Sequence, residues 1–184
     1  MVTIVQKGDE VLSKIAKEVP ENTILSSKIK GIIKNMKIAL DSQCDGVAIA
    51  APQIGESLRI FVVSERVLEV PDEASDRKIK PRDDIKKYGH LIFINPTLAR
   101  MSRDKRMLEE GCLSVRYLYG KIKRSNKATV TAYDENGKKF TRGASGLLAQ
   151  VFQHEVDHLN GKLFIDSAIE IKDIPPEEWN AGKK

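Results

Sequence analysis

Two of the three histidines in this chain lie four positions apart in the segment QHEVDHLNG, residues 153–161. On a helix, this spacing places His154 and His158 on one face with Cβ atoms about 6 Å apart, a separation that one metal ion can bridge. Glu155 is rotated by about 100° from His154, so its carboxylate would lie beside the metal. A divalent cation lowers the pKa of a bound water towards ~7, and a nearby carboxylate can accept the proton. The pattern predicts a metal-dependent hydrolase.

A helix over residues 145–160 must position these groups, and Gly161 is expected to form its C-cap. Its apolar residues cover more than one face, which is typical of a buried helix. They are Leu147, Leu148, Val151, Phe152, Val156 and Leu159. The alternative interpretation is a pair of histidines packed against polar neighbours. Burying two imidazoles and a carboxylate without partners is costly, which favours the metal site.

A catalytic metal site uses about three protein ligands, so a third ligand must lie elsewhere. In one class of metalloproteases a later histidine completes the site, but Phe164 occupies that position here. The later glutamates are poor candidates, because two of the three follow a pair of prolines. They are Glu170, Glu177 and Glu178. His90 precedes a predicted strand and is expected at the surface.

The remaining candidate ligands are the two cysteines. Cys112 lies in EEGCLSV, where Gly111 would permit an unusual backbone angle and the chain is expected to run extended into the core. Cys44 follows a predicted helix and is expected to be a small buried or half-buried residue. A lone Cys112 would ordinarily be an inert core thiol, so its assignment stays open at this point.

The rest of the chain predicts one domain over residues 1–184. Behind a serine cap, an amphipathic helix begins near Ser26 and ends before Gly46, with one face formed by Ile29, Ile32, Ile33, Met36 and Leu40. Residues 59–65 and 90–98 read as strands of one sheet. Between them, residues 69–89 predict an exposed insertion loop. Residues 127–143 predict a hairpin with a turn at Asn136 and Gly137, and residues 172–184 predict a partly ordered tail.

Composition excludes several classes of protein. The apolar and charged fractions, 41% and 31%, are typical of a globular protein, and no apolar run is long enough to cross a membrane. Two cysteines do not build a disulfide framework, and the N-terminal segment lacks the apolar region of a secretory signal. We therefore expect the cytoplasm. Net charge is +5, but the basic clusters at 100–106 and 121–127 are expected to be solvated faces rather than a DNA-binding surface.

Three segments together resemble the motifs of peptide deformylases, in the same order. They are GVAIAAPQ (46–53), EGCLSV (110–115) and QHEVDHLNG (153–161). The resemblance implies an α+β fold in which small antiparallel β-sheets pack around a central metal-binding helix. It also implies Cys112 as the third metal ligand beside His154 and His158. The activity would be removal of the formyl group from N-formylmethionyl nascent peptides, with release of formate.

The same resemblance assigns the remaining site residues. Glu155 would shuttle a proton, and the Gln53 side-chain amide and the Leu113 backbone NH would stabilise the oxyanion. The substrate would be crowded by Gly46, Val47, Ala48 and Ile49. One divalent metal per chain is implied, Fe²⁺ in the cell, with Zn²⁺, Ni²⁺ or Co²⁺ in purified protein. We expect a monomer with transient ribosome association.

Two other functions fit parts of the pattern. A zincin endopeptidase would need a third histidine or glutamate ligand, which the sequence does not visibly offer. A metal-stabilised binding protein would have no need of Glu155, and structural sites usually have four protein ligands. The chain also departs from the usual deformylase motifs. Ala48 and Ile49 replace a glycine and a leucine, and Arg116 stands where many members have proline.

Overall fold

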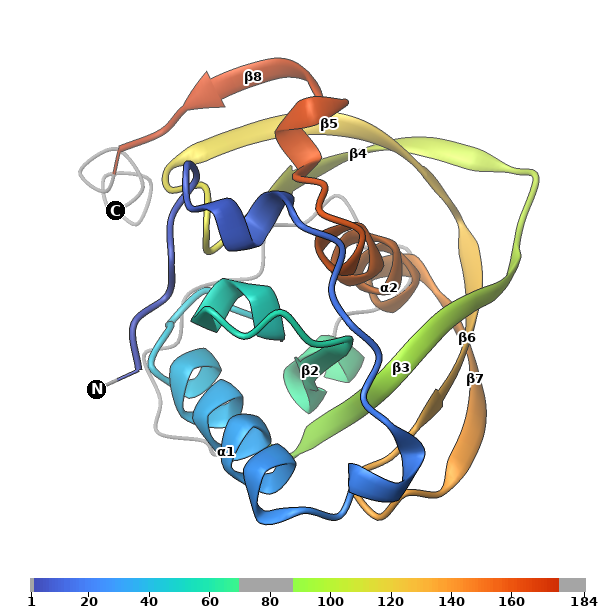
Figure 1. Ribbon diagram of the computed structural model, residues 1–184. Helices are drawn as coiled ribbons and strands as arrows, with labels where there is room; N and C mark the ends of the chain where they lie inside the picture. The colour runs from blue at the N-terminus through green and yellow to red at the C-terminus, as the bar shows by residue number, and fades with distance from the viewer. Residues whose placement is uncertain (1, 70–87, 176–184) are drawn as a thin grey trace.

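The computed structural model describes residues 2–69 and 88–175 (Figure 1). Most of the loop predicted at 69–89 and most of the tail predicted at 172–184 lie outside these residues. The described part of the chain forms two antiparallel sheets, two α-helices and several short 3-10 helices. The predicted α+β class is therefore correct.

The larger sheet contains five strands in the order β1-β2-β3-β6-β7, all antiparallel. They are β1 (Ala48–Ala50), β2 (Ile60–Ser64), β3 (His90–Met101), β6 (Lys127–Tyr133) and β7 (Lys139–Ser145). The predicted strands at 59–65 and 90–98 pair as expected, and so does the predicted hairpin. In its turn, Asp134 Oδ1 accepts hydrogen bonds from the backbone amides of Asn136 and Lys138.

The smaller sheet has three strands in the order β4-β5-β8. They are β4 (Lys105–Gly111), β5 (Leu118–Ser125) and β8 (Ile169–Asp173). The buried residues of these two strands include a charged side chain in each: Leu108 and Glu110 in β4, and Gly120, Ile122, Arg124 and Ser125 in β5. These strands lack the apolar alternation that predicts a strand, because only two of their buried residues, Leu108 and Ile122, have large apolar side chains. β8 includes the first residues of the segment predicted as a tail.

Helix α1 (Ser27–Asp41) begins at the predicted cap, where the Ser26 side chain accepts a hydrogen bond from the Ile29 amide. All five apolar residues predicted to face the core are buried. Helix α2 (Gly146–Leu159) also matches its prediction, and Gly161 has the left-handed φ of 69° expected of a C-terminal glycine. No helix in the described ranges is long and apolar enough to span a membrane.

Helix α2 lies at the centre of the molecule and contacts strands of both sheets (Figure 1). Aromatic packing fixes it against the larger sheet: the rings of Phe93 and Phe152 meet edge to face at 5.1 Å, and those of Phe61 and Phe93 stack at 4.5 Å. Helix α2, which contains the HEVDH segment, thus lies between the five-stranded sheet and the three-stranded sheet.

Candidate metal-binding active site

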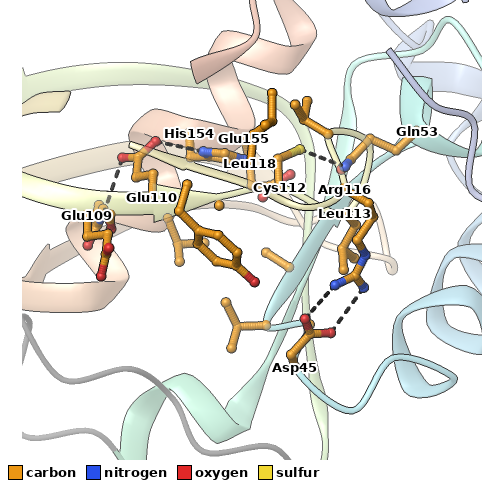
Figure 2. A pocket seen from close by; sticks show the side chains of 18 of the residues that line it. Asp45, Gln53, Glu109, Glu110, Cys112, Leu113, Arg116, Leu118, His154 and Glu155 are labelled. Carbon is orange, nitrogen blue, oxygen red and sulfur yellow. Dashed lines mark hydrogen bonds and ion pairs between the residues drawn. The ribbon is translucent and has the colours of Figure 1, made fainter. Parts of the chain in front are cut away.

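Cys112, His154 and His158 converge beside a cavity, which Cys112 and His154 line and behind which His158 is buried. One nitrogen from each imidazole and the Cys112 sulfur all lie within 4.8 Å of one another, and Sγ of Cys112 is 3.2 Å from Nε2 of His158. Both histidines come from α2, whereas Cys112 directly follows β4. Figure 2 shows His154 and Cys112 close together. The tertiary structure therefore brings the cysteine candidate to the two histidines.

The position of Cys112 depends on Gly111, although not for the reason that we predicted. The φ of Gly111 is not positive. Instead, Gly111 pairs with Tyr119 of β5, and a Cβ on Gly111 would lie 2.6 Å from Cε1 of the Tyr119 ring. After Cys112 the chain turns back, with Val115 N donating to Cys112 O at 3.1 Å, so the predicted extended path is wrong. Leu113 and Val115 are nevertheless buried.

A buried charge network orients His154. Its Nδ1 lies 2.8 Å from Oε2 of Glu110, and Glu110 is held by Nε and Nη2 of Arg124 at 2.7 and 2.9 Å. Arg124 Nη1 also donates to Asp157 Oδ2 at 2.6 Å. We call the Arg124–Glu110 pair the buried bridge; Asp157, whose side chain is 31% exposed, joins it from the surface side. A partner on the outer ring nitrogen fixes the orientation of a metal-binding histidine. The sequence analysis did not predict this network.

The charges around Cys112 favour a thiolate. Burial raises the pKa of this thiol, but the positive charge and hydrogen bonds of His158 and His154 outweigh burial and lower the pKa to about 5. Burial likewise opposes protonation of His154, whereas hydrogen bonds to Cys112 and Glu110 raise its pKa. The Gln53 Nε2 and Ser114 N donors lie 3.5 and 3.4 Å from the sulfur. One thiolate and two imidazoles are ligands that divalent metals such as zinc and iron prefer, and the ion would supply the positive charge that stabilises the thiolate. This set of donors therefore fits a divalent metal ion.

Glu155 is 3% exposed and lines the cavity beside the three ligands. Burial raises the pKa of its carboxyl to about 7. Within the described part of the chain its Oε2 has no hydrogen-bond partner. A buried carboxylate oxygen without a protein partner is suited to bind a water molecule or a substrate atom.

Gln53 lies on a short 3-10 helix, Ala51–Ile54, and its amide is fixed at both ends. Its Oε1 accepts a hydrogen bond from Ala50 N at 2.8 Å, and its Nε2 donates to Ser114 Oγ at 3.2 Å. This arrangement directs the Nε2 group towards Cys112 and the cavity (Figure 2). Leu113 lines the same wall.

The cavity has a volume of about 200 Å³, and it is lined by Gly46, Val47 and Ala48 as predicted for the substrate-binding segment. The fourth predicted residue, Ile49, does not line it. The Ile49 side chain is fully buried in the cluster that packs against α1, because alternate residues of β1 point to opposite faces. Its predicted contact with substrate therefore finds no support in the side-chain placement.

The residues set aside as ligands lie elsewhere. The His90 ring contacts Asp41 at 3.0 Å at the start of β3, and its side chain is 10% exposed, so it is more buried than predicted. Cys44 is exposed, contrary to the predicted buried or half-buried position. Phe164 packs its ring on His154, with centroids 6.2 Å apart. Phe164, which occupies the position of the last histidine ligand in one class of metalloproteases, thus packs against one of the two imidazoles.

Comparison with known proteins places this geometry in a family. The family model described as polypeptide deformylase matches residues 1–173. The peptide deformylase of Halothermothrix orenii is 39% identical over 164 residues, which cover 89% of this chain and 91% of that protein. The chloroplastic/mitochondrial peptide deformylase 1A of Arabidopsis thaliana is 38% identical over 166 residues, which cover 90% of this chain. Those residues span 61% of the length of the plant protein.

Solved structures agree with the sequence matches. The crystal structure of a peptide deformylase from Legionella pneumophila superposes with a TM-score of 0.73 at 35% identity. The match covers 100% of this chain and 92% of the Legionella chain. With a family model over nearly the whole chain and relatives well above 30% identity, this protein belongs to the polypeptide deformylase family.

Proposed function

We propose that this chain removes the formyl group from the N-terminal formylmethionine of newly synthesised polypeptides and releases formate. One divalent metal ion would be held by Cys112, His154 and His158. The observation that carries the proposal is the buried Glu155 carboxylate, which lies in the cavity beside these ligands with one oxygen unpaired among the described residues. Family membership supports the same reaction.

The metal, when bound, would polarise the formyl carbonyl and increase the acidity of water. Glu155 would accept the proton of the attacking water and later pass it to the leaving amine. A pKa raised to about 7 by burial suits both steps, because a group that titrates near neutrality can accept and donate a proton.

Gln53 and Leu113 would stabilise the oxygen that becomes negatively charged. The Gln53 amide is preorganised by Ala50 and Ser114, so no reorientation would be needed as charge develops. Removal of one such donor typically costs about 3 kcal/mol of transition-state stabilisation. Gly46, Val47 and Ala48 would crowd the acyl carbon and favour formyl over larger groups. Ile49 would support this wall from the core side.

The identity of the metal is part of the proposal. A thiolate with two imidazoles is a soft donor set that suits Fe²⁺, Zn²⁺, Co²⁺ or Ni²⁺. We expect Fe²⁺ in the cell and the other ions in purified protein. Under iron, both the metal and Cys112 would be sensitive to oxidation. Activity should therefore fall on aeration and persist under anaerobic preparation, and unchanged activity after prolonged aeration would contradict iron.

The location, partners and domain organisation are proposals of the same kind. Cys44 and Cys112 are free, which suits a reducing compartment such as the cytoplasm. We also propose one catalytic domain over residues 1–184, a monomer, and transient association with the ribosome where formylated chains emerge. Residues 176–184, the end of the predicted tail, lie outside the described part of the chain.

The decisive experiment measures formate release from N-formyl-Met-Ala-Ser by anaerobically prepared protein, with casein cleavage and metal content in parallel. We expect formate and no casein cleavage. Glu155→Gln should retain the metal and lose turnover by about 10²–10⁴-fold. Casein cleavage without formate would favour the endopeptidase, and full turnover by Glu155→Gln would refute the proton-transfer role.

A further inference from the structure

A second arginine–carboxylate contact lies at the rim of the cavity. Arg116 Nη1 donates to Asp45 Oδ2 at 2.5 Å, and Nη2 donates to Asp45 Oδ1 at 3.1 Å (Figure 2). The same Nη2 donates to Gln43 Oε1 at 2.9 Å. The Arg116 and Asp45 side chains are 23% and 18% exposed, whereas those of Arg124 and Glu110 are 8% and 3% exposed. We call Arg116, Asp45 and Gln43 the rim bridge.

The rim bridge joins two segments that are far apart in sequence and that both line the cavity. Asp45 directly precedes the wall formed by residues 46–48, and Arg116 belongs to the turn that follows Cys112. The walls are in close contact further in, since a Cβ on Gly46 would lie 3.3 Å from Cδ1 of Leu113. Asp45 and Arg116 line the same cavity as Cys112, His154 and Glu155, so a peptide bound at the ligands lies close to the rim bridge.

One side of the rim bridge is anchored independently of Arg116. Gln43 Nε2 donates to Ser42 Oγ at 2.8 Å, and Ser42 Oγ donates to Ala39 O at 2.7 Å, at the end of α1. Arg66 Nη1 donates to Cys44 O at 2.8 Å. Arg116 therefore ties the turn after Cys112 to a segment that α1 already holds in place. Loss of Arg116 should loosen the outer part of the turn, whereas Cys112 remains fixed by β4.

We propose that Arg116 is a positioning residue: through Asp45 and Gln43, it holds the two walls at the rim and aligns the substrate residues that follow formylmethionine. This inference rests on the proposed deformylation. Arg116 contacts Asp45 and Gln43 rather than the three metal-ligand candidates or Glu155. Its loss should weaken binding of the downstream peptide and leave the chemical step nearly unchanged.

The test compares two substrates, N-formyl-Met-Ala-Ser and N-formylmethionine amide, which lacks downstream residues. For Arg116→Ala we expect KM for the tripeptide to rise about threefold to fivefold, the upper end of what one partly exposed ion pair contributes. The kcat and the KM for the amide should stay within about twofold of wild type. Lys37→Ala is the matched control, because Lys37 on α1 pairs with Glu135 at 2.9 Å outside the cavity lining. Lys37→Ala should leave the KM for both substrates unchanged.

Two further measurements separate positioning from general destabilisation. Calorimetry with the product peptide Met-Ala-Ser should show weaker binding to Arg116→Ala by the same factor as KM. The exchanged pair Asp45→Arg with Arg116→Asp should recover part of the lost affinity. Arg116→Gln provides the same comparison if the alanine variant folds poorly.

The proposal would be overturned if the KM for the tripeptide were unchanged in both Arg116 variants. It would also be overturned if the KM rose by the same factor for the tripeptide and for the amide. If the wild-type protein releases no formate, the proposed function fails by itself. Binding of Met-Ala-Ser would still decide the role of the rim bridge in that case. Equal binding of this peptide by wild type and Arg116→Ala would overturn that role.

Discussion

The buried bridge and the rim bridge use the same chemistry in two different environments. Arg124 and Glu110 have side chains 8% and 3% exposed, whereas Arg116 and Asp45 are 23% and 18% exposed. A charge that loses its partner in the interior stays poorly solvated, but one at a rim can be solvated by water. The inner pair should therefore support folding and ligand geometry, and loss of the outer pair should disturb substrate alignment at little cost in stability.

The largest expected effect is the loss of Arg124. Arg124→Ala would leave Glu110 and Asp157 without their shared cation, next to a metal-ligand candidate. Removing one partner of a buried ion pair costs about 3–5 kcal/mol of folding free energy. Urea unfolding followed by circular dichroism measures this loss, and Lys37→Ala supplies the control for an outer ion pair. A loss below about 1 kcal/mol would remove the distinction between the two bridges.

A smaller effect is expected on metal affinity when Glu110 is changed. Glu110→Gln would keep the shape of the side chain but weaken its hold on His154 Nδ1. Loss of such a partner typically weakens metal binding by about 10–100-fold. Competition with a chromogenic chelator measures the affinity. The control is Glu109→Gln, because Glu109 is the exposed neighbour on β4. Equal metal affinity in Glu110→Gln and wild type would show that the buried bridge does not orient the ligand.

The smallest effect is expected on the stability of the rim variant. Arg116→Ala should lower the free energy of unfolding by about 1 kcal/mol or less, the range of partly exposed ion pairs. The same urea titration measures it beside Arg124→Ala. Destabilisation as large as that of Arg124→Ala would make Arg116 a structural residue, and its effect on KM would then need another explanation.

The elements with regular apolar periodicity were predictable from the sequence. Helix α1, with its serine cap, and helix α2, closed by Gly161, follow their predicted limits closely. The strand pair β2 and β3 was also predictable, since both strands are dense in β-branched and aromatic residues. In each case the local pattern and the packing in the folded protein demand the same residues.

The smaller sheet and the path around Cys112 were not predictable in this way. Strands β4 and β5 bury Glu110 and Arg124, which read as solvent-exposed residues until their pairing is known. A side chain at position 111 would collide with the ring of Tyr119 on the neighbouring strand. The local sequence around Gly111 does not indicate this contact. Ile49 faces the core because the register of β1 against β2 turns it away from the cavity. Each of these features depends on a partner distant in sequence.

The sequence by itself determined the chemical groups: two imidazoles and a carboxylate on one buried helix, a cysteine after a glycine, and the motifs that resemble a deformylase. These follow from spacing along a single helix or segment, where geometry is local. Only the tertiary structure decided that Cys112 meets His158 at 3.2 Å, that Arg124 and Glu110 orient His154, and that Arg116 bridges the rim. The physical reason is that those contacts join strands and loops whose separation in sequence carries no information about their separation in space.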